Sequence, residues 1–533
     1  MRPASFDASL NWLAAVDHRH LLTRGLRGFE KECLRVGSSG RLSETPHASE
    51  WGSALTHPYL TTDYSEALLE FVTPPHERVE TAFSLLEELH AFVLRSAGDE
   101  LLWPASMPCI VDVDESVPIA QYGSSNEGRL RTIYRSGLGF RYGRAMQAIA
   151  GIHFNFSLSP DFWLPYHAFL GSKLDVRAFQ SERMMGLVRN YRRIGWLVTY
   201  LYGASPAFCK SFHPEGHARL ESLSSDTWYA PHSTSLRMSD MGYRNSTQAR
   251  LHISVNSLDE YIRELTMALT TRDPSYEAIG VVVDGKYRQL NANILQLENE
   301  YYSSIRPKPA SKTPRLVAAL RETGIEYVEV RTLDLNPFAP LGVTEDQAKF
   351  IEILLIRCLL ADGGPVSKPE QDEIDQRELT VAWEGRRPKL SLCQDGRAIT
   401  LQAWAIEIVD ELARLAPLMD DEEGRYVKVV KEAREAVLDS ARTMSGQVLE
   451  QLRSGTGSFF EWAFEIGHQH KNHFLEHRFL PGRLSSLEAL AAESLRDAQA
   501  LETAADAPFE EFLAAHQAGG PTSGSESSVE ICD

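Results

Sequence analysis

The sequence predicts an α+β fold in which a mixed region of strands and helices, residues 1–341, is followed by a helical region, residues 342–517. Strand-like alternation recurs in the first region, as in GIHFNFSLS and IEYVEVRTLDL, between helical stretches and loops holding Gly, Ser and Asn. Apolar residues at i, i+3 and i+4 recur in the second, as in TEDQAKFIEILLIRCLLAD and LQAWAIEIVDELARLAPLM. The small, polar end AGGPTSGSESSVEICD predicts a disordered tail over residues 518–533.

Composition is that of a globular protein with a large core, because 43% of the 533 residues are hydrophobic and 24% are charged. Asp and Glu number 73 against 54 Lys and Arg, and no basic block offers a footprint for a phosphate backbone. Nucleic acid is therefore not an expected partner. The sequence leaves the oligomeric state open, and a monomer is the simplest expectation.

Cysteine usage and hydropathy point to the cytoplasm. The six cysteines are scattered without a CxxC or a closely spaced His, so a zinc or disulfide framework is not expected. Asp7 and Asp17 interrupt the N-terminal apolar pattern, which predicts a short surface helix and not a secretory segment. The run FIEILLIRCLLAD carries Glu352 and Arg357 and is too short to cross a bilayer.

The first candidate site lies in RGFEKECLRV, residues 27–36. In a strand, Glu30 and Glu32 fall on one face, which Leu34 and Val36 continue. An edge strand with its charges in solvent would explain the pattern equally well. The alternative is a buried face that carries two carboxylates as part of a functional site.

The second candidate segment, TTDYSEALLEFVTPP, has two readings. As a helix it would place Asp63 at the N-cap with Glu66 at the third position, an arrangement like a capping box. As a strand ending at TPP it would place Glu70 among Leu68 and Val72, on an apolar face where a carboxylate needs a cation.

Two further strands complete the set. In IEYVEVRTLDLNPF, Tyr327, Glu329, Arg331 and Leu333 share one face, so a carboxylate and a guanidinium lie side by side, in a catalytic site or in an ion pair at the surface. In GIHFNFSLS, the polar face carries His153, which by itself decides little.

Carboxylates on several strands with one histidine form an oxygen-rich site that suits Mg²⁺ or Mn²⁺ better than zinc. Magnesium in such sites usually bridges nucleotide phosphates. The sequence has no GxxxxGK[ST] and no GxGxxG, so ATP, if used, is held neither by a P-loop nor by a Rossmann turn.

Taken together, these segments resemble the glutamate-cysteine ligase family of the bacterial single-chain type. The resemblance rests on ten segments in the family's order: RGFEKECLRV, GSALTHPYLTTDYSEALLEFVTP, GDELLWPASMPC, IAQYGSSNEGR, YRSGLGFRYG, GIHFNFS, YLYGASPA, SLRMSDMGY, LQLENEYYSSIRPK and GIEYVEVRTLDLNPF. It is specific over about residues 10–345 and looser to about residue 515.

The resemblance implies a glutamine-synthetase-like fold, in which a curved, mainly antiparallel sheet forms a funnel surrounded by helices. It also implies the reaction: ATP phosphorylates the γ-carboxylate of L-glutamate, and the amine of L-cysteine displaces the phosphate to give γ-glutamylcysteine in the first step of glutathione biosynthesis. The substrates would be L-glutamate, L-cysteine and ATP, with Mg²⁺ or Mn²⁺ as the cofactor. The base that takes the amine proton is not identified.

The resemblance also assigns roles to individual residues. Arg331 and Arg237 match arginines that face the phosphoryl group and the substrate carboxylate, where a bidentate guanidinium suits the task. Glu66 does not match a ligand and is expected to be structural. The residues that match the metal site are Glu30, Glu32, Asp63, Glu70, His153 and Glu329. Those that match the acceptor pocket or lie near it are Tyr134, Arg135, Tyr243, Tyr302, Gln147, Ile149 and Asn155.

Three other functions would use similar residues. A related ATP-dependent carboxylate-amine ligase with another acceptor is disfavoured because the SLRMSDMGY segment matches on the acceptor side too. A magnesium-dependent phosphohydrolase would use the same carboxylates without the amine. A non-catalytic binding protein is disfavoured because every expected acidic and arginine position is filled.

Overall fold

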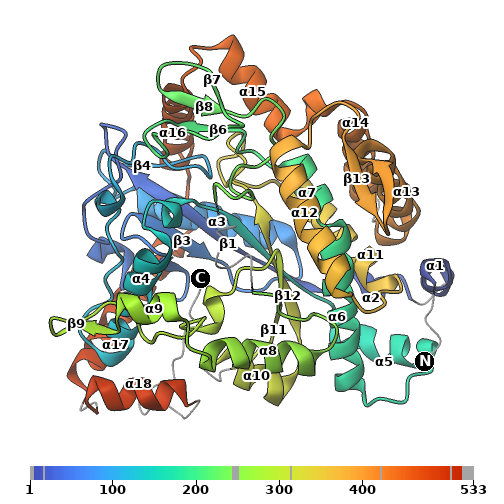
Figure 1. The fold of residues 1–533 in the computed structure, drawn as a ribbon, viewed down its shortest axis with the longest axis horizontal. Coiled ribbons are helices and arrows are strands. Elements are labelled where there is room, and N and C mark those ends of the chain that lie inside the picture. Colours follow the sequence, from blue (N-terminus) through green and yellow to red (C-terminus); the bar gives the residue numbers. More distant parts are fainter. Residues whose placement is uncertain are drawn as a thin grey trace.

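The computed structural model of the chain describes residues 5–15, 18–242, 251–311, 315–420, 423–504 and 507–518. Figure 1 shows strands in the interior of the molecule, including β1, β3 and β12, with helices around them. Every strand pair in the main sheet is antiparallel. The predicted α+β fold with a mainly antiparallel sheet is confirmed.

The main sheet of the described residues has seven strands, ordered β11-β12-β5-β1-β3-β2, with β4 paired to the end of β1. Strand β1 is therefore central, and the reading of RGFEKECLRV as a solvated edge strand is wrong. The strands are β1 (Leu26–Val36), β2 (Leu60–Thr62), β3 (Leu68–Val72), β4 (Leu101–Leu102), β5 (Ile152–Ser157), β11 (Ile305–Lys308) and β12 (Tyr327–Leu333).

The two faces of this sheet differ in chemistry because side chains alternate along each strand. On one face Phe29, Phe154 and Val330 form an apolar row across β1, β5 and β12, and Phe29 packs edge-on against Phe83 of α3 (Val79–Leu94). The opposite face carries the acidic residues. The sheet thus has an apolar back that is covered by helices and a polar front.

Helices α3, α6 (Val176–Ile194) and α11 (Glu345–Leu360) anchor the back of the sheet. Helix α11 begins with a capping box between Thr344 and Gln347, which satisfies backbone N–H groups at its start. It is buried almost all round, and its Glu352 accepts a hydrogen bond of 3.1 Å from Nε of Arg27 on β1. That buried ion pair ties the helical region to the central strand.

The remaining helices surround this core. None of the described helices combines the length and apolar character that crossing a bilayer requires. They are α1 (Phe6–Ala14), α2 (His20–Thr23), α4 (Asn126–Tyr142), α5 (Pro160–Leu170), α7 (Trp196–Tyr202), α8 (Leu258–Thr270), α9 (Pro274–Ile279), α10 (Leu316–Thr323), α12 (Lys368–Glu384), α13 (Leu401–Met419), α14 (Arg425–Leu438), α15 (Met444–Ser454), α16 (Phe459–Leu475), α17 (Arg483–Thr503) and α18 (Phe509–Gln517).

Within the described ranges, three small sheets lie outside the main one. The hairpin in the otherwise helical second region turns at Asp395 and Gly396, both with positive φ, a dipeptide that favours such tight turns. The strands are β6 (Ala207–Cys209), β7 (Glu221–Ser222) and β8 (Thr227–Tyr229); β9 (Val282–Val283) and β10 (Lys286–Tyr287); and β13 (Ser391–Gln394) and β14 (Arg397–Thr400).

Helices of the second region share one hydrophobic core with the sheet, since Leu354 of α11 and Val409 of α13 belong to the same buried cluster as Phe29. The division of the chain at residue 341 stays a prediction. Of the predicted tail, residues 519–533 lie outside the described residues.

Two segments differ from the structure that the sequence predicts. Residues 68–72 of TTDYSEALLEFVTPP form strand β3 and not a helix, because pairing with β1 outweighs the local capping pattern. In β12, a bulge places two residues, Arg331 and Thr332, opposite one residue of β5. Leu333 therefore turns to the apolar back of the sheet and does not share a face with Glu329 and Arg331.

Candidate active site

Three buried side chains from neighbouring strands form the centre of the site: Glu30 of β1, His153 of β5 and Glu329 of β12. Each offers a potential ligand atom, and these atoms lie within 4.8 Å of one another. The register creates this cluster, because Glu30 lies opposite His153 while Glu329 lies opposite Asn155 two residues along the same strand. Carboxylate oxygens with one imidazole are donors that suit a divalent cation.

His153 is held between two carboxylates. Its Nδ1 lies 2.9 Å from Oε2 of Glu30, and its Nε2 lies 3.5 Å from Oε1 of Glu32. Burial, and then the charge of Arg331, lower the pKa of His153, which favours the neutral ring. A neutral ring has one N–H and one lone pair, so it can donate to only one of these carboxylates and can offer the other nitrogen to a cation.

A second acidic group continues the site along β1. Glu32 lies directly opposite Glu70 of β3, and like charges in that position destabilise a sheet unless a cation balances them. Burial, and then the charge of Asp63, raise the pKa of Glu32 to about 8. A bound Mg²⁺ or Mn²⁺ would oppose the effects of burial and of the neighbouring carboxylate and would favour the ionised form of Glu32. These residues therefore fit the predicted metal.

Basic side chains approach the same cluster from β11 and β12. Lys308 Nζ lies 3.0 Å from Oε2 of Glu329, and Arg331 donates to Oε1 of the same carboxylate. Burial raises the pKa of Glu329, but the charges of Lys308 and Arg331 outweigh burial and hold this pKa well below its usual range. Arg306 lies opposite Glu329 in the register. Glu329 is therefore ionised, and the positively charged side chains lie together at this end of the site.

Arg237 reaches the site from the loop that follows β8. Its side chain is almost fully buried, and its Nη2 donates to the carbonyl of Arg331 over 3.0 Å. Gly151 makes room for it, because a Cβ there would lie 2.0 Å from Arg237 Nη2. The Gly151 N–H also donates to Oε2 of Glu32 over 2.7 Å, so one glycine positions a guanidinium and a carboxylate.

A polar cavity of about 90 Å³ opens beside these residues. Tyr134 and Arg135 of α4 line it, as do Gln147 and Tyr302, together with Glu32, Asp63, His153, Arg237 and Arg331 of the charged set. Four residues predicted for the acceptor pocket thus line the same hollow as three predicted metal ligands, Glu32, Asp63 and His153.

Two predicted acceptor-pocket residues lie elsewhere. Ile149 is fully buried in the core and is absent from the lining of this cavity. Asn155 lines a different cavity and donates to Oε1 of Glu30 over 2.7 Å. Tyr243 falls outside the described residues.

The larger cavity, of about 780 Å³, lies at the other end of the acidic row. Gly28 and Glu30 of β1 line it, and its apolar walls include Pro75, Leu158 and Trp163. Because Gly28, Glu30 and Glu32 alternate along one strand face, that face leads from the larger cavity to the polar one.

Glu66 has a structural role in this arrangement. Its Oε1 accepts from the backbone N–H of His47 and its Oε2 from that of Gln121, each over 2.8 Å. Sequence reasoning missed Lys308 and Arg306, although the spacing of two in SIRPK would place both on one face of a strand. The intervening Pro307 conceals that pattern, because proline is rare inside strands.

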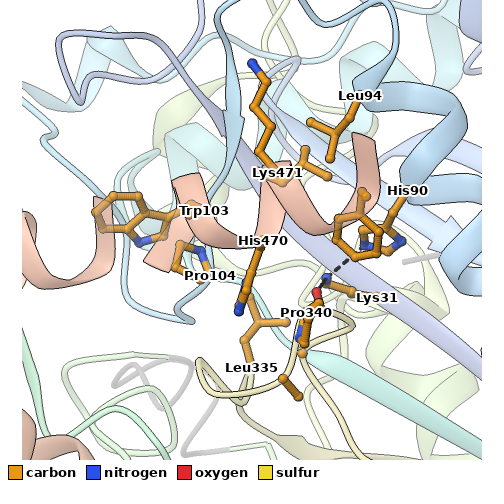
Figure 2. Close-up of a pocket in the computed structure, with 14 residues that line it drawn as sticks. Lys31, His90, Leu94, Trp103, Pro104, Leu335, Pro340, His470 and Lys471 are labelled. Atoms are coloured by element: carbon orange, nitrogen blue, oxygen red, sulfur yellow. Dashed lines mark hydrogen bonds between the residues drawn. The ribbon is translucent and has the colours of Figure 1, made fainter. Parts of the chain in front are cut away.

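The back of β1 carries a basic residue, Lys31, directly behind the acidic face. Figure 2 shows it among side chains of α3 and α16. Its Nζ lies 2.8 Å from Nε2 of His90 and 3.2 Å from the carbonyl oxygen of Pro340. Burial lowers the pKa of Lys31 to about 8. Charge on this strand therefore alternates in sign between the two faces.

Comparison with known proteins accounts for this combination of sheet, acidic cluster and paired cavities. The family model described as glutamate-cysteine ligase matches residues 10–381. Among curated relatives, the glutamate-cysteine ligases of Alcanivorax borkumensis and Pseudomonas aeruginosa are 46% identical over 92% of this chain and 94% of theirs, and 44% identical over 95% of this chain and 96% of theirs.

Solved structures agree with the sequence comparisons. The crystal structure of glutamate-cysteine ligase from Francisella tularensis in complex with AMP matches with a TM-score of 0.88 and 34% identity, over 93% of this chain and 98% of that one. A bifunctional glutathione synthetase from Pasteurella multocida matches with a TM-score of 0.67 and 24% identity, covering 89% of this chain and 56% of that one, which shows likeness of fold alone. The coverage and sequence identity of these matches show that the chain belongs to the glutamate-cysteine ligase family.

Proposed function

We propose that the acidic front of the sheet and its two cavities are the site at which this ligase joins the γ-carboxylate of L-glutamate to the amine of L-cysteine. The reaction consumes ATP, passes through γ-glutamyl phosphate and yields γ-glutamylcysteine, ADP and phosphate, the first step of glutathione biosynthesis. The observation that carries this assignment is the row Gly28, Glu30 and Glu32, which connects a cavity large enough for a nucleotide with a small polar one.

ATP is assigned to the larger cavity. Its volume lies within the range of small-molecule sites, and its apolar walls suit a purine ring. Glu30 lies at its inner end, so phosphates that extend along β1 would approach the carboxylate cluster. The AMP complex of the Francisella relative supports a nucleotide as a ligand of this fold.

Mg²⁺ or Mn²⁺ is assigned to Glu30, His153 and Glu329, with Glu32, Glu70 and Asp63 alongside. A bound divalent cation would neutralise phosphate charge and hold the triphosphate in line with the accepting carboxylate. The support is the chemistry of the donors: buried carboxylates face one another, and Glu32 has a pKa of about 8 in the absence of a cation.

The protein's own side chains would supply the rest of the electrostatics. Arg331 is held in place by Glu329 and lies beside the proposed metal ligands. There its fixed guanidinium can stabilise charge on the transferring phosphoryl group. Arg237 lines the polar cavity, where it can pair with a substrate carboxylate. Tyr134 and Tyr302 supply an apolar wall with polar tips for the acceptor. No covalent nucleophile is required.

A coupled assay tests the assignment. The purified protein should release ADP and phosphate rapidly only when glutamate and cysteine are both present, and γ-glutamylcysteine should be found by mass spectrometry. Rapid ATP turnover without either amino acid would indicate a phosphohydrolase. A different amine as the preferred acceptor would indicate a related ligase.

The proposal includes a cytoplasmic, monomeric enzyme. The scattered cysteines support a reducing compartment. Size-exclusion chromatography with light scattering tests the oligomeric state, and a mass well above 59.7 kDa would exclude the monomer.

A further inference from the structure

The described part of residues 501–517 forms a strap that crosses the outer side of α4, the helix that carries Tyr134 and Arg135. The strap consists of the end of α17, residue 504, residues 507 and 508, and α18. Figure 1 shows α17 and α18 at the lower left of the molecule near α4, and α18 contacts α4 directly. The strap is more than 350 residues distant in sequence from the helix that it covers.

Glu502 fixes the strap to the start of α4. Its carboxylate accepts hydrogen bonds from the backbone N–H and hydroxyl of Ser124 and, over 3.0 Å, from the N–H of Ser125, which is the N-cap of α4. These hydrogen bonds, that of the Ser124 hydroxyl foremost, lower the pKa of Glu502. At Gly123, φ is +83° and a Cβ would lie 2.2 Å from Oε1 of Glu502, so the turn closes directly on this carboxylate.

The next part of the strap packs against the body of α4. Phe509 and Leu513 form a buried cluster with Leu130 and Tyr134 of α4, a cluster separate from the main core. The guanidinium of Arg129 lies 4.1 Å from the centre of the Phe509 ring. Tyr134 thus lines the polar cavity and packs in the strap's cluster.

The end of the strap holds a second wall of the polar cavity. Nε of Arg315 pairs with the carboxylate of Glu298 over 2.9 Å, while its Nη1 donates to the carbonyl of His516 over 2.9 Å. Glu298 immediately precedes Asn299 and Glu300, both of which line the cavity. The strap therefore contacts α4 on one side of the hollow and is linked through Arg315 to the residue that precedes the other wall, without lining the hollow itself.

We propose that this strap positions the acceptor pocket, so that its residues set the affinity for L-cysteine without touching the substrate. The inference rests on the proposed function, because it takes the polar cavity as the acceptor site. Without the strap, the outer side of α4 would lose its apolar support, and Tyr134 would be free to shift. Displacements of about 1 Å in positioning groups cost up to about 100-fold in rate.

The test compares two identical substitutions. Leu513→Ala removes buried volume beneath Tyr134, while Leu487→Ala removes the same side chain from α17 where it packs in the main core. The KM for cysteine should rise about 10-fold in Leu513→Ala and less than about 2-fold in Leu487→Ala. The KM for ATP should stay near wild type in both, because the nucleotide cavity lies at the other end of β1. Equal KM values for cysteine in the two variants would overturn the proposal.

A second pair of variants covers the case in which the leucine variants fail to fold. Glu502→Gln weakens the exposed attachment to Ser124, and Glu493→Gln changes a carboxylate of α17 for which no contact with α4 is found among the described residues. A rise in the KM for cysteine confined to Glu502→Gln supports the strap, and its absence refutes it. Failure of the proposed function is distinguishable: wild-type protein would then form no γ-glutamylcysteine, or Tyr134→Ala would leave the KM for cysteine unchanged.

Discussion

Removal of the charge at Glu329 is the sharpest test of the metal site. Glu329→Gln preserves size and an acceptor oxygen but abolishes the negative charge at a position that is fully buried and lies within reach of Glu30 and His153. We expect weaker binding of Mg²⁺ and a loss of activity of about 100-fold or more, the scale of one key electrostatic group. That loss corresponds to about 2.7 kcal/mol in the transition state.

The effect on stability should be smaller, because two consequences oppose each other. Breaking a buried ion pair costs about 3–5 kcal/mol. However, Lys308 is 14% exposed and can turn toward water, and the substitution removes the charge of Glu329, which together with burial opposes the lowering of the Glu30 pKa. We expect the lost ion pair and the relieved repulsion largely to offset each other. The net change in the free energy of unfolding of the metal-free protein should be within about 2 kcal/mol.

Three measurements separate these effects: steady-state activity at saturating Mg²⁺, the metal-induced rise in melting temperature, and the melting temperature without metal. Glu66→Gln is the matched control, since Glu66 accepts from two backbone N–H groups and should affect stability without changing the metal dependence. If Glu329→Gln retains near-wild-type activity and the wild-type metal-induced shift, Glu329 is not a ligand and the proposed cluster is wrong.

Three other perturbations give distinct outcomes. Arg331→Lys retains the charge but loses the planar fork, so kcat should fall about 10- to 100-fold; unchanged kcat would exclude a bidentate role. The acceptor 2-aminobutyrate should be ligated with a loss of about 10- to 200-fold or less relative to cysteine, and serine should be poorer because its hydroxyl would be partly unsatisfied; kcat/KM values that favour serine would contradict an apolar wall. In the folded protein, burial lowers the pKa of His57 and of His516 from 6.5 to about 4. Their contribution to the free energy of unfolding is therefore complete above about pH 6.5, where both states are neutral, and is lost as the pH falls toward 4. At about pH 5.5 each should cost about 1.4 kcal/mol in the free energy of unfolding, measured by urea titration as the difference in pH dependence between the wild type and His57→Gln or His516→Gln. A variant that loses as much stability as the wild type between about pH 7.5 and 5.5 would refute this for its histidine.

Period-two alternation correctly predicted that Glu30 and Glu32 share a strand face, and likewise Glu329 and Arg331, because alternation is a local property of a strand. What joins Glu30 to His153 and Glu329 is pairing between segments more than 100 residues apart, which no local pattern encodes. Their union in one site was inferred from the chemistry of the donors and then from the resemblance to a family, and not from spacing.

Two further features depended on tertiary context. The segment of Glu66 and Glu70 satisfies the local rules for a helix start, and only the pairing of residues 68–72 with β1 and β2 makes that part a strand. The bulge that sends Leu333 to the back of the sheet has no signature in IEYVEVRTLDL, where alternation continues through it. Among acceptor-side predictions, Tyr134 lines the polar cavity while Asn155 lines the larger cavity, since alternation reports the face of a strand and not the position along the site.

The charge alternation of Glu30, Lys31 and Glu32 has a consequence for how the sheet forms. A slip of β1 by one residue against β3 or β5 would turn both carboxylates into the apolar helical layer around His90 and would place an ammonium group among the remaining acids. The carboxylates in the apolar layer would then be buried without partners, which costs far more than a misplaced aliphatic side chain. The residues that would hold the cation therefore also select the correct register of the strand. A chain with β1 in the wrong register could not persist as an inactive but stable form.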